Sequence, residues 1–94
     1  YTDVWVSMGQ EPLSADPFSI FGPYQLNEQI LSVANPDCMV MHDLPAHIGE
    51  EITEAVFESK NSVVFEQAEN KLHVVKGLLT LLAGDSSAER PPRE

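Results

Sequence analysis

Three short runs of β-branched, aromatic and other apolar residues stand out along the chain, at 2–6, 38–41 and 62–65. The first run passes directly into the turn-like Ser7-Met8-Gly9, and the second is continuously apolar between turn residues. Runs of this length and composition, bounded by turn residues, are typical of buried strands. The pattern therefore predicts three strands.

Between and after these runs, apolar residues recur at helical spacing instead. Asp16 followed by Pro17 has the signature of a helix N-terminus, and Asn27 is a good N-cap for a second helix. The last periodic stretch carries the widest apolar stripe and is followed by Gly84, a common residue just beyond a helix. The predicted helices cover about 17–21, 28–34, 50–57 and 67–82.

Strands and helices alternate in this prediction, which indicates an α/β fold. We interpret residues 1–84 as a fragment of a doubly wound parallel-sheet domain, in βαβαβα order with a long C-terminal helix, and residues 85–94 as a disordered tail. Ligands of such domains bind beyond the carboxyl ends of the strands. We therefore expect a site formed by the loops that start at Ser7, His42 and Glu66.

The charge of the chain limits its partners. Fifteen acidic residues against five basic ones give a net charge of −10, which argues against a nucleic-acid or anionic membrane partner. No apolar run approaches the length of a transmembrane helix. The single cysteine, Cys38, excludes an internal disulfide and fits a reducing compartment, so we expect the cytoplasm, or the mitochondrial matrix or plastid of a eukaryote.

Because a core strand starts beside Tyr1, we also expect the chain to be part of a longer protein.

Four segments resemble, in the same order and register, segments of the ornithine carbamoyltransferases. Residues 1–11 resemble the family's ornithine-binding segment, and Phe21-Gly-Pro-Tyr-Gln25 matches a further family segment. His42-Asp-Leu-Pro-Ala-His47, followed by Gly49-Glu-Glu-Ile-Thr53, resembles the family's His-Cys-Leu-Pro loop and the helix after it. Ala68-Glu-Asn-Lys-Leu-His73 resembles the Ala-Glu-Asn-Arg segment of its last helix, so the resemblance extends over about residues 1–84.

The resemblance implies transfer of a carbamoyl group from carbamoyl phosphate to the δ-amine of L-ornithine, without a cofactor. It also implies a homotrimer with active sites between subunits. A preceding N-terminal domain is implied as well, which carries a Ser-Thr-Arg-Thr-Arg phosphate loop and receives the last helix. Because that loop does not occur in these 94 residues, we expect the chain alone to be inactive.

By the resemblance, Asp3, Ser7 and Met8 bind ornithine. Asp3 pairs with the α-amino group, and Ser7 and Met8 close over the substrate. A carboxylate inside an apolar strand needs a partner to offset the cost of its burial, and Gly9 gives a moving loop its backbone freedom. The alternatives are a capping or strand-edge role for Asp3 and a plain turn after the strand.

By the resemblance, His42, Asp43 and Leu44 hold the carbamoyl group, and Lys71 contacts the phosphate. Asp43 stands in the catalytic position of the family's cysteine. A carboxylate there favours the protonated, non-nucleophilic form of the ornithine amine and repels carbamoyl phosphate. Lys71 replaces an arginine and loses its planar fork, although Lys71 can equally be a solvated helix residue. Ile48 replaces a further arginine that is common in the family.

These replacements leave a second hypothesis open, namely a non-catalytic remnant or amino-acid-binding module derived from a carbamoyltransferase. The sequence does not predict a metal site, because neither His47 nor His73 has a histidine partner at ligand spacing. The acidic residues of the predicted third helix are interpreted as a solvated face; they are Glu50, Glu51 and Glu54.

Overall fold

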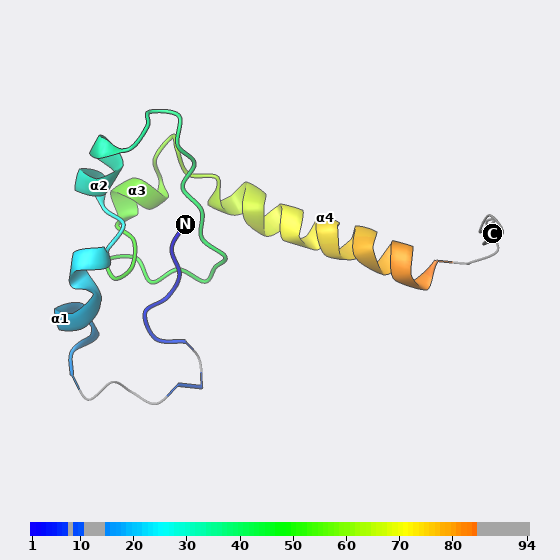
Figure 1. Ribbon diagram of the computed structural model, residues 1–94, viewed down its shortest axis with the longest axis horizontal. Coiled ribbons are helices and arrows are strands. Elements are labelled where there is room, and N and C mark those ends of the chain that lie inside the picture. The colour runs from blue at the N-terminus through cyan, green and yellow to red at the C-terminus, as the bar shows by residue number, and fades with distance from the viewer. Residues whose placement is uncertain (8, 11–14, 85–94) are drawn as a thin grey trace, which may run out of the picture.

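The computed structural model describes residues 1–7, 9–10 and 15–84; Met8 and the predicted tail at 85–94 lie outside this part of the chain. The described residues form helices and single-residue β-bridges. A body is formed around the first helical elements, and the last helix projects away from it (Figure 1). The elements are α1 (Pro17–Phe21), the 3₁₀ turn η1 (Gly22–Tyr24), α2 (Glu28–Val33), α3 (Glu54–Phe57) and α4 (Val64–Ala83).

Capping side chains set the starts of the three short helices. Asp16 caps α1 and Asn27 caps α2, each accepting a hydrogen bond from a backbone N–H of the first turn, which confirms both predictions. The third helix is shorter than the predicted 50–57. Thr53 caps α3 and accepts the N–H of Val56, so the residues before Thr53 stay outside the helix.

The predicted parallel sheet is reduced to isolated parallel bridges. Thr2 pairs with His42, and Val40 pairs with Ser62. The three predicted strand segments therefore lie side by side and parallel, with the second between the first and the third. The prediction of extended strands is nevertheless wrong for the described residues, because the pairing does not continue beyond these single-residue bridges. Three short strands alone offer too few ladder hydrogen bonds and too little covered face for a stable sheet.

The third predicted strand, at 62–65, is wrong beyond Ser62, because α4 already begins at Val64. Val64 is fully buried in the first turn of α4. A short β-branched run can be a strand or the buried start of a helix, and periodicity alone does not distinguish the two. At its other end α4 stops at Gly84, as predicted.

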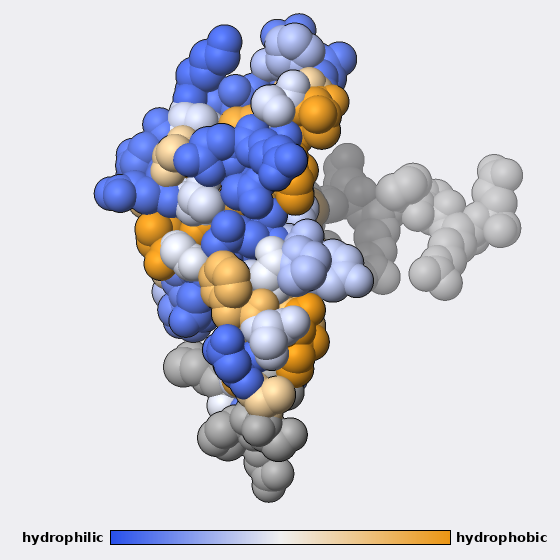
Figure 2. Space-filling view, turned by 90° about the vertical axis from the view of Figure 1, so that its left-hand side faces the viewer, coloured by the Kyte–Doolittle hydropathy of each residue, from blue (hydrophilic) through white to orange (hydrophobic). Residues whose placement is uncertain are grey.

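The hydrophobic core of the body is small. Val40, Ile52 and Val56 are buried, and Leu31 of α2 and Phe57 of α3 pack against them. The face of the body turned away from α4 is largely polar, with scattered apolar patches (Figure 2). A core of this size gives the body only modest stability.

In the described part of the chain, helix α4 is joined to the body through its first turns. Phe65 packs edge-on against Phe57, with ring centroids 5.7 Å apart, and α4 does not run along any other helix of the described residues. Although α4 has 20 residues, none of the helices in the described ranges is long and apolar enough to cross a membrane.

Replacing Gly77 with alanine is expected to stabilise α4 by about 1 kcal/mol, because glycine in a helix interior loses more conformational entropy than alanine. A Cβ at Gly77 meets no atom within 4 Å. Thermal melting followed by far-UV circular dichroism should show a higher midpoint. Gly49→Ala is the matched control with the opposite expected sign, because Gly49 has a φ of +91°. A lower midpoint for Gly77→Ala would contradict the expectation.

Candidate functional site

Four residues of the predicted site line one cavity of about 290 Å³: Asp3, Ser7, Asp43 and Leu44. The cavity lies between the N-terminal segment and the loop that follows His42, two segments that the Thr2–His42 bridge holds in register. The structure therefore brings the first two predicted loops to one place. The roles of the individual residues stay predictions. The remaining wall is formed by Val4, Val6, Pro45 and His47.

Lys71 lines a second cavity, of about 410 Å³, on the first half of α4. Asp43 lines both cavities, so they adjoin at its side chain. Lys71 is exposed and is the one cation that lines either of these two cavities in the described part of the chain. The predicted phosphate contact and the predicted ornithine contacts thus lie on different sides of Asp43.

His42 is fully buried and both of its ring nitrogens are engaged. The N–H of Leu44 donates to Nδ1 at 2.8 Å. Because Nδ1 accepts, Nε2 carries the ring proton and donates it to Glu51 Oε1, also at 2.8 Å. The backbone N–H of His42 donates to Gln67 Oε1 at 3.1 Å. His42 is therefore a fixed structural centre of the loop, with no ring nitrogen free for a ligand.

Leu44 has a φ of +59° and precedes a cis peptide bond to Pro45. A left-handed backbone is unfavourable for a leucine and costs on the order of 1–3 kcal/mol. The hydrogen bond from its N–H to His42 Nδ1 holds this conformation. Since the N–H is occupied, it is not free to bind a ligand in the adjacent cavity.

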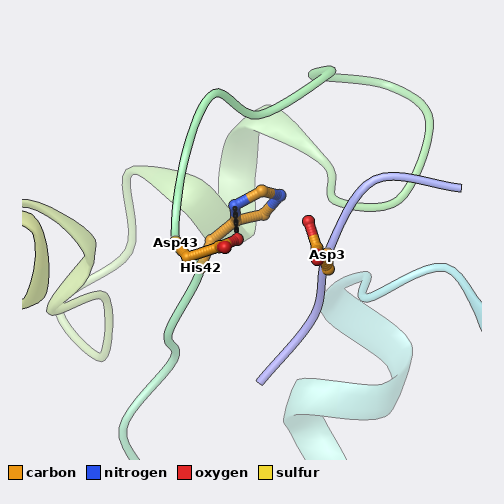
Figure 3. A group of neighbouring side chains, drawn as sticks. All are labelled: Asp3, His42 and Asp43. Carbon is orange, nitrogen blue, oxygen red and sulfur yellow. Dashed lines mark ion pairs between the residues drawn. The ribbon is translucent and has the colours of Figure 1, made fainter. Parts of the chain in front are cut away.

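Asp3 and Asp43 place two carboxylates beside His42 (Figure 3). Asp43 Oδ1 lies 3.7 Å from His42 Nδ1. Because Nδ1 already accepts a hydrogen bond, it cannot donate to this oxygen, which is buried and has no hydrogen-bond partner in the described part of the chain. Two carboxylates in such a position attract a cation and repel an anion.

Asp3 itself is exposed, so the expected burial of its carboxylate in a strand is wrong. Its Oδ1 accepts the N–H of Val4 at 2.7 Å. Ser7 is also exposed, and its N–H donates to Gln10 Oε1. Gly9 has a φ of +84°, which agrees with the expected need for glycine at this position.

The structure places His47 beside two carboxylates that the sequence analysis did not connect with it. His47 Nδ1 is 3.7 Å from Glu50 Oε2 and 3.9 Å from Glu51 Oε2. His47 and Glu50 are about half exposed. The contact between His47 and Glu50 lies at the surface, where such contacts have small energetic weight, whereas the Glu51 side chain is fully buried.

Sequence reasoning missed Glu51 and Gln67. Glu51 was expected on a solvated helix face, but it is fully buried, and its Oε1 accepts hydrogen bonds from His42 Nε2 and from the N–H of His47. Gln67 bonds to His42 and donates through Nε2 to the hydroxyl of Tyr1 at 3.0 Å. These two side chains tie the loop, the N-terminal segment and the first turn of α4 together.

The loop that follows His42 is also held by hydrogen bonds from Gln25, which precedes α2 in the chain. The side-chain amide of Gln25 donates to the carbonyl oxygens of Gly49 and Glu50, at 3.0 and 2.7 Å. The N–H of Gly49 donates to the carbonyl of Ile52 at 2.8 Å. Because Ile52 is a core residue, these bonds connect the loop that lines the cavity to the core.

Comparison with known proteins shows the family of the chain. Residues 1–82 match the family model described as aspartate/ornithine carbamoyltransferase, Asp/Orn binding domain. The chain is similar to the ornithine carbamoyltransferase of Nostoc sp., with 60% identity over 84 residues, and to the anabolic ornithine carbamoyltransferase of Pyrococcus furiosus, with 54% identity over 84 residues. Each alignment covers 89% of this chain, but only 28% and 27% of the two relatives.

Solved structures give the same result. The ornithine carbamoyltransferase from Pyrococcus furiosus superposes with a TM-score of 0.80 at 52% identity, over 92% of this chain and 28% of that one. The ornithine transcarbamoylase from Giardia lamblia superposes with a TM-score of 0.75 at 28% identity, over 93% of this chain and 26% of that one. The chain thus spans little more than a quarter of the length of these relatives. It belongs to the aspartate/ornithine carbamoyltransferase family and matches the Asp/Orn binding domain of that family.

Proposed function

We propose that this chain supplies part of the ornithine-binding domain of an ornithine carbamoyltransferase of arginine biosynthesis. The complete enzyme would transfer the carbamoyl group of carbamoyl phosphate to the δ-amine of ornithine and release citrulline and phosphate. Relatives with 50–60% identity that bear this name support the proposal. We also propose a cytoplasmic homotrimer and a doubly wound α/β domain for the complete protein.

The observation that carries the choice of ornithine is the charge of the first cavity. Its wall contains Asp3 and Asp43 and, among the described residues, neither lysine nor arginine. Ornithine has two ammonium groups that two carboxylates can pair with, whereas aspartate would add a second carboxylate to an already negative wall. The cavity therefore favours a diamino acid within a family that uses either substrate.

In this proposal each residue has a limited task. Asp3 pairs with the α-amino group of ornithine, and Ser7, with Met8 from the sequence, contacts the remainder of the amino-acid head. His42 positions the loop, so that the Leu44 carbonyl can accept a hydrogen bond from the carbamoyl NH₂. The neutral δ-amine would attack the carbamoyl carbon, the C–O bond to phosphate would break, and the amine would lose a proton.

Asp43 and Lys71 decide how much of this chemistry is retained. Asp43 would hold the δ-ammonium in its protonated form, which binds well but does not attack. Lys71 is one exposed cation for the phosphate, without an arginine fork. The unpaired Asp43 oxygen favours the second candidate function, an amino-acid-binding module derived from a carbamoyltransferase. For the 94-residue chain alone we expect no measurable transfer.

Titration of the chain with L-ornithine, followed by NMR, tests the binding proposal. Resonances of Ser7 and Leu44 should shift, L-aspartate should cause no comparable shift, and Asp3→Asn should weaken ornithine binding by about tenfold, the usual effect of losing one charged hydrogen bond. Asp37→Asn is the matched control, since Asp37 lies outside this cavity. Equal shifts with aspartate, or none with ornithine, would exclude the ornithine site.

A further inference from the structure

The loop at 47–51 brings three potential metal ligands together. His47 Nδ1 lies 3.7 Å from Glu50 Oε2 and 3.9 Å from Glu51 Oε2, and the three atoms all lie within 4.8 Å of one another. Two atoms that bind one zinc ion at about 2.1 Å, with the tetrahedral angle between them, lie about 3.4 Å apart. His47 and Glu50 are about half exposed, so small movements of their side chains would bring the three atoms to this spacing.

One of the three atoms, Glu51 Oε2, is a buried carboxylate oxygen without a partner. The Glu51 side chain is fully buried, and Oε2 accepts no hydrogen bond from the described residues. His47 Nδ1, at 3.9 Å, is too far away to donate one. Burial of a charged oxygen costs free energy unless a donor or a cation lies beside it. The position of Oε2 therefore indicates a ligand between Glu51 and His47.

Hydrogen bonds hold the loop in this arrangement. Glu51 Oε1 accepts the Nε2–H of His42 at 2.8 Å and the backbone N–H of His47 at 2.7 Å. The side chain of Gln25 fixes the backbone between His47 and Glu51 through two further hydrogen bonds. Carboxylates that bind metals are themselves hydrogen-bonded in this way, which orients them toward the ion. Glu51 is therefore oriented in advance, with Oε2 free to bind.

We propose that His47, Glu50 and Glu51 bind one divalent transition-metal ion of the zinc type. Imidazole nitrogen and carboxylate oxygen are both ordinary zinc ligands, whereas magnesium and calcium prefer oxygen ligands alone. The two carboxylates match the charge of the ion, and a water molecule would complete the coordination. All three ligands belong to one loop of this chain. The proposal goes beyond the proposed function and does not depend on it.

A second group of the described residues has similar spacing but is a poorer metal site. Asp3, His42 and Asp43 also place three potential ligand atoms within 4.8 Å of one another (Figure 3). However, His42 Nδ1 already accepts the N–H of Leu44, and Nε2 donates its proton to Glu51. Neither ring nitrogen of His42 has a lone pair left for a metal, whereas His47 Nδ1 has no hydrogen-bond partner among the described residues.

Calorimetric titration of the whole 94-residue chain with zinc chloride is the first test, in a Cys38→Ser background that removes the thiol. One zinc ion is expected to bind, and magnesium far more weakly. His47→Ala should weaken zinc binding on the order of a hundredfold, and Glu50→Gln on the order of tenfold, since even the loss of an outer partner of a ligand costs about 10–100-fold. His73→Ala is the matched control. This exposed histidine contacts Glu69 alone, so its loss should leave the zinc affinity unchanged.

NMR of the histidine ring nitrogens identifies the atom that binds. The His47 Nδ1 resonance should shift on addition of zinc, and by more than either ring nitrogen of His42. Zinc should also raise the midpoint of thermal unfolding, because it binds the folded loop, and Glu51→Gln should remove both effects. No saturable zinc binding, binding that survives His47→Ala, equal binding of magnesium, or a larger shift at His73 than at His47 would each overturn the proposal.

Discussion

Glu51→Ala is expected to unfold the body of the chain. Glu51 Oε1 is the acceptor for the buried His42 Nε2–H and for the His47 N–H. Without it both donors lose their partner, at about 1–3 kcal/mol each. Small domains have only about 5–15 kcal/mol of stability in total, and this core is small. Urea denaturation, followed by the fluorescence of Trp5, should give a midpoint near zero denaturant.

Two variants separate this effect from a general loss of charge. Glu51→Gln keeps an oxygen acceptor at the same place and should retain most of the stability. Glu50→Ala removes the neighbouring carboxylate, which is about half exposed, and should change the unfolding free energy by less than about 0.5 kcal/mol. A Glu51→Ala chain as stable as Glu50→Ala would mean that the buried hydrogen bonds do not hold the loop.

Much of the site was predictable because its loops carry dense local signals. The turn residues after Val6 and Met41, and the capping residues Asp16 and Asn27, act over a few residues only. The structure agrees with such local predictions, as Asp16 and Asn27 cap α1 and α2. The position of the cavity follows from the parallel pairing of the first two segments, which the order of elements already indicated.

What could not be predicted depends on contacts between distant residues. Glu51 resembles any acidic residue at a helix start, and only the position of His42 reveals that it is buried. Gln67 has no local signature for its bonds to His42 and Tyr1. The strand at 62–65 failed for the same reason. The burial of Val64 against the body favours a helix at this position. The four residues 62–65 alone do not show that Val64 is buried, so their pattern fits a strand equally well.

Asp43→Cys is expected to raise carbamoyl transfer on the order of a hundredfold in a chimera. In this chimera, residues 1–84 replace the matching segment of the Pyrococcus furiosus enzyme. The unpaired carboxylate is removed from beside the reacting amine, so the amine can become neutral and carbamoyl phosphate is no longer repelled; changes in electrostatics at a reacting centre have effects of about this size. Citrulline formation at saturating ornithine and carbamoyl phosphate measures it.

The companion variants assign this gain to charge or to the thiol. Asp43→Asn removes the charge without adding sulfur, so a recovery equal to that of Asp43→Cys would mean that the carboxylate alone blocks the reaction. Lys71→Arg restores a planar guanidinium group, which can donate two parallel hydrogen bonds to the phosphate. The change should mainly lower the KM for carbamoyl phosphate, because Lys71 lines a different cavity from Asp3. If the unaltered chimera already turns over as fast as its parent, Asp43 is no obstacle and the derived binding module is ruled out. If instead Asp43→Cys binds ornithine normally but stays inactive, the defect lies in the rest of the loop, whose geometry depends on His42 and Glu51.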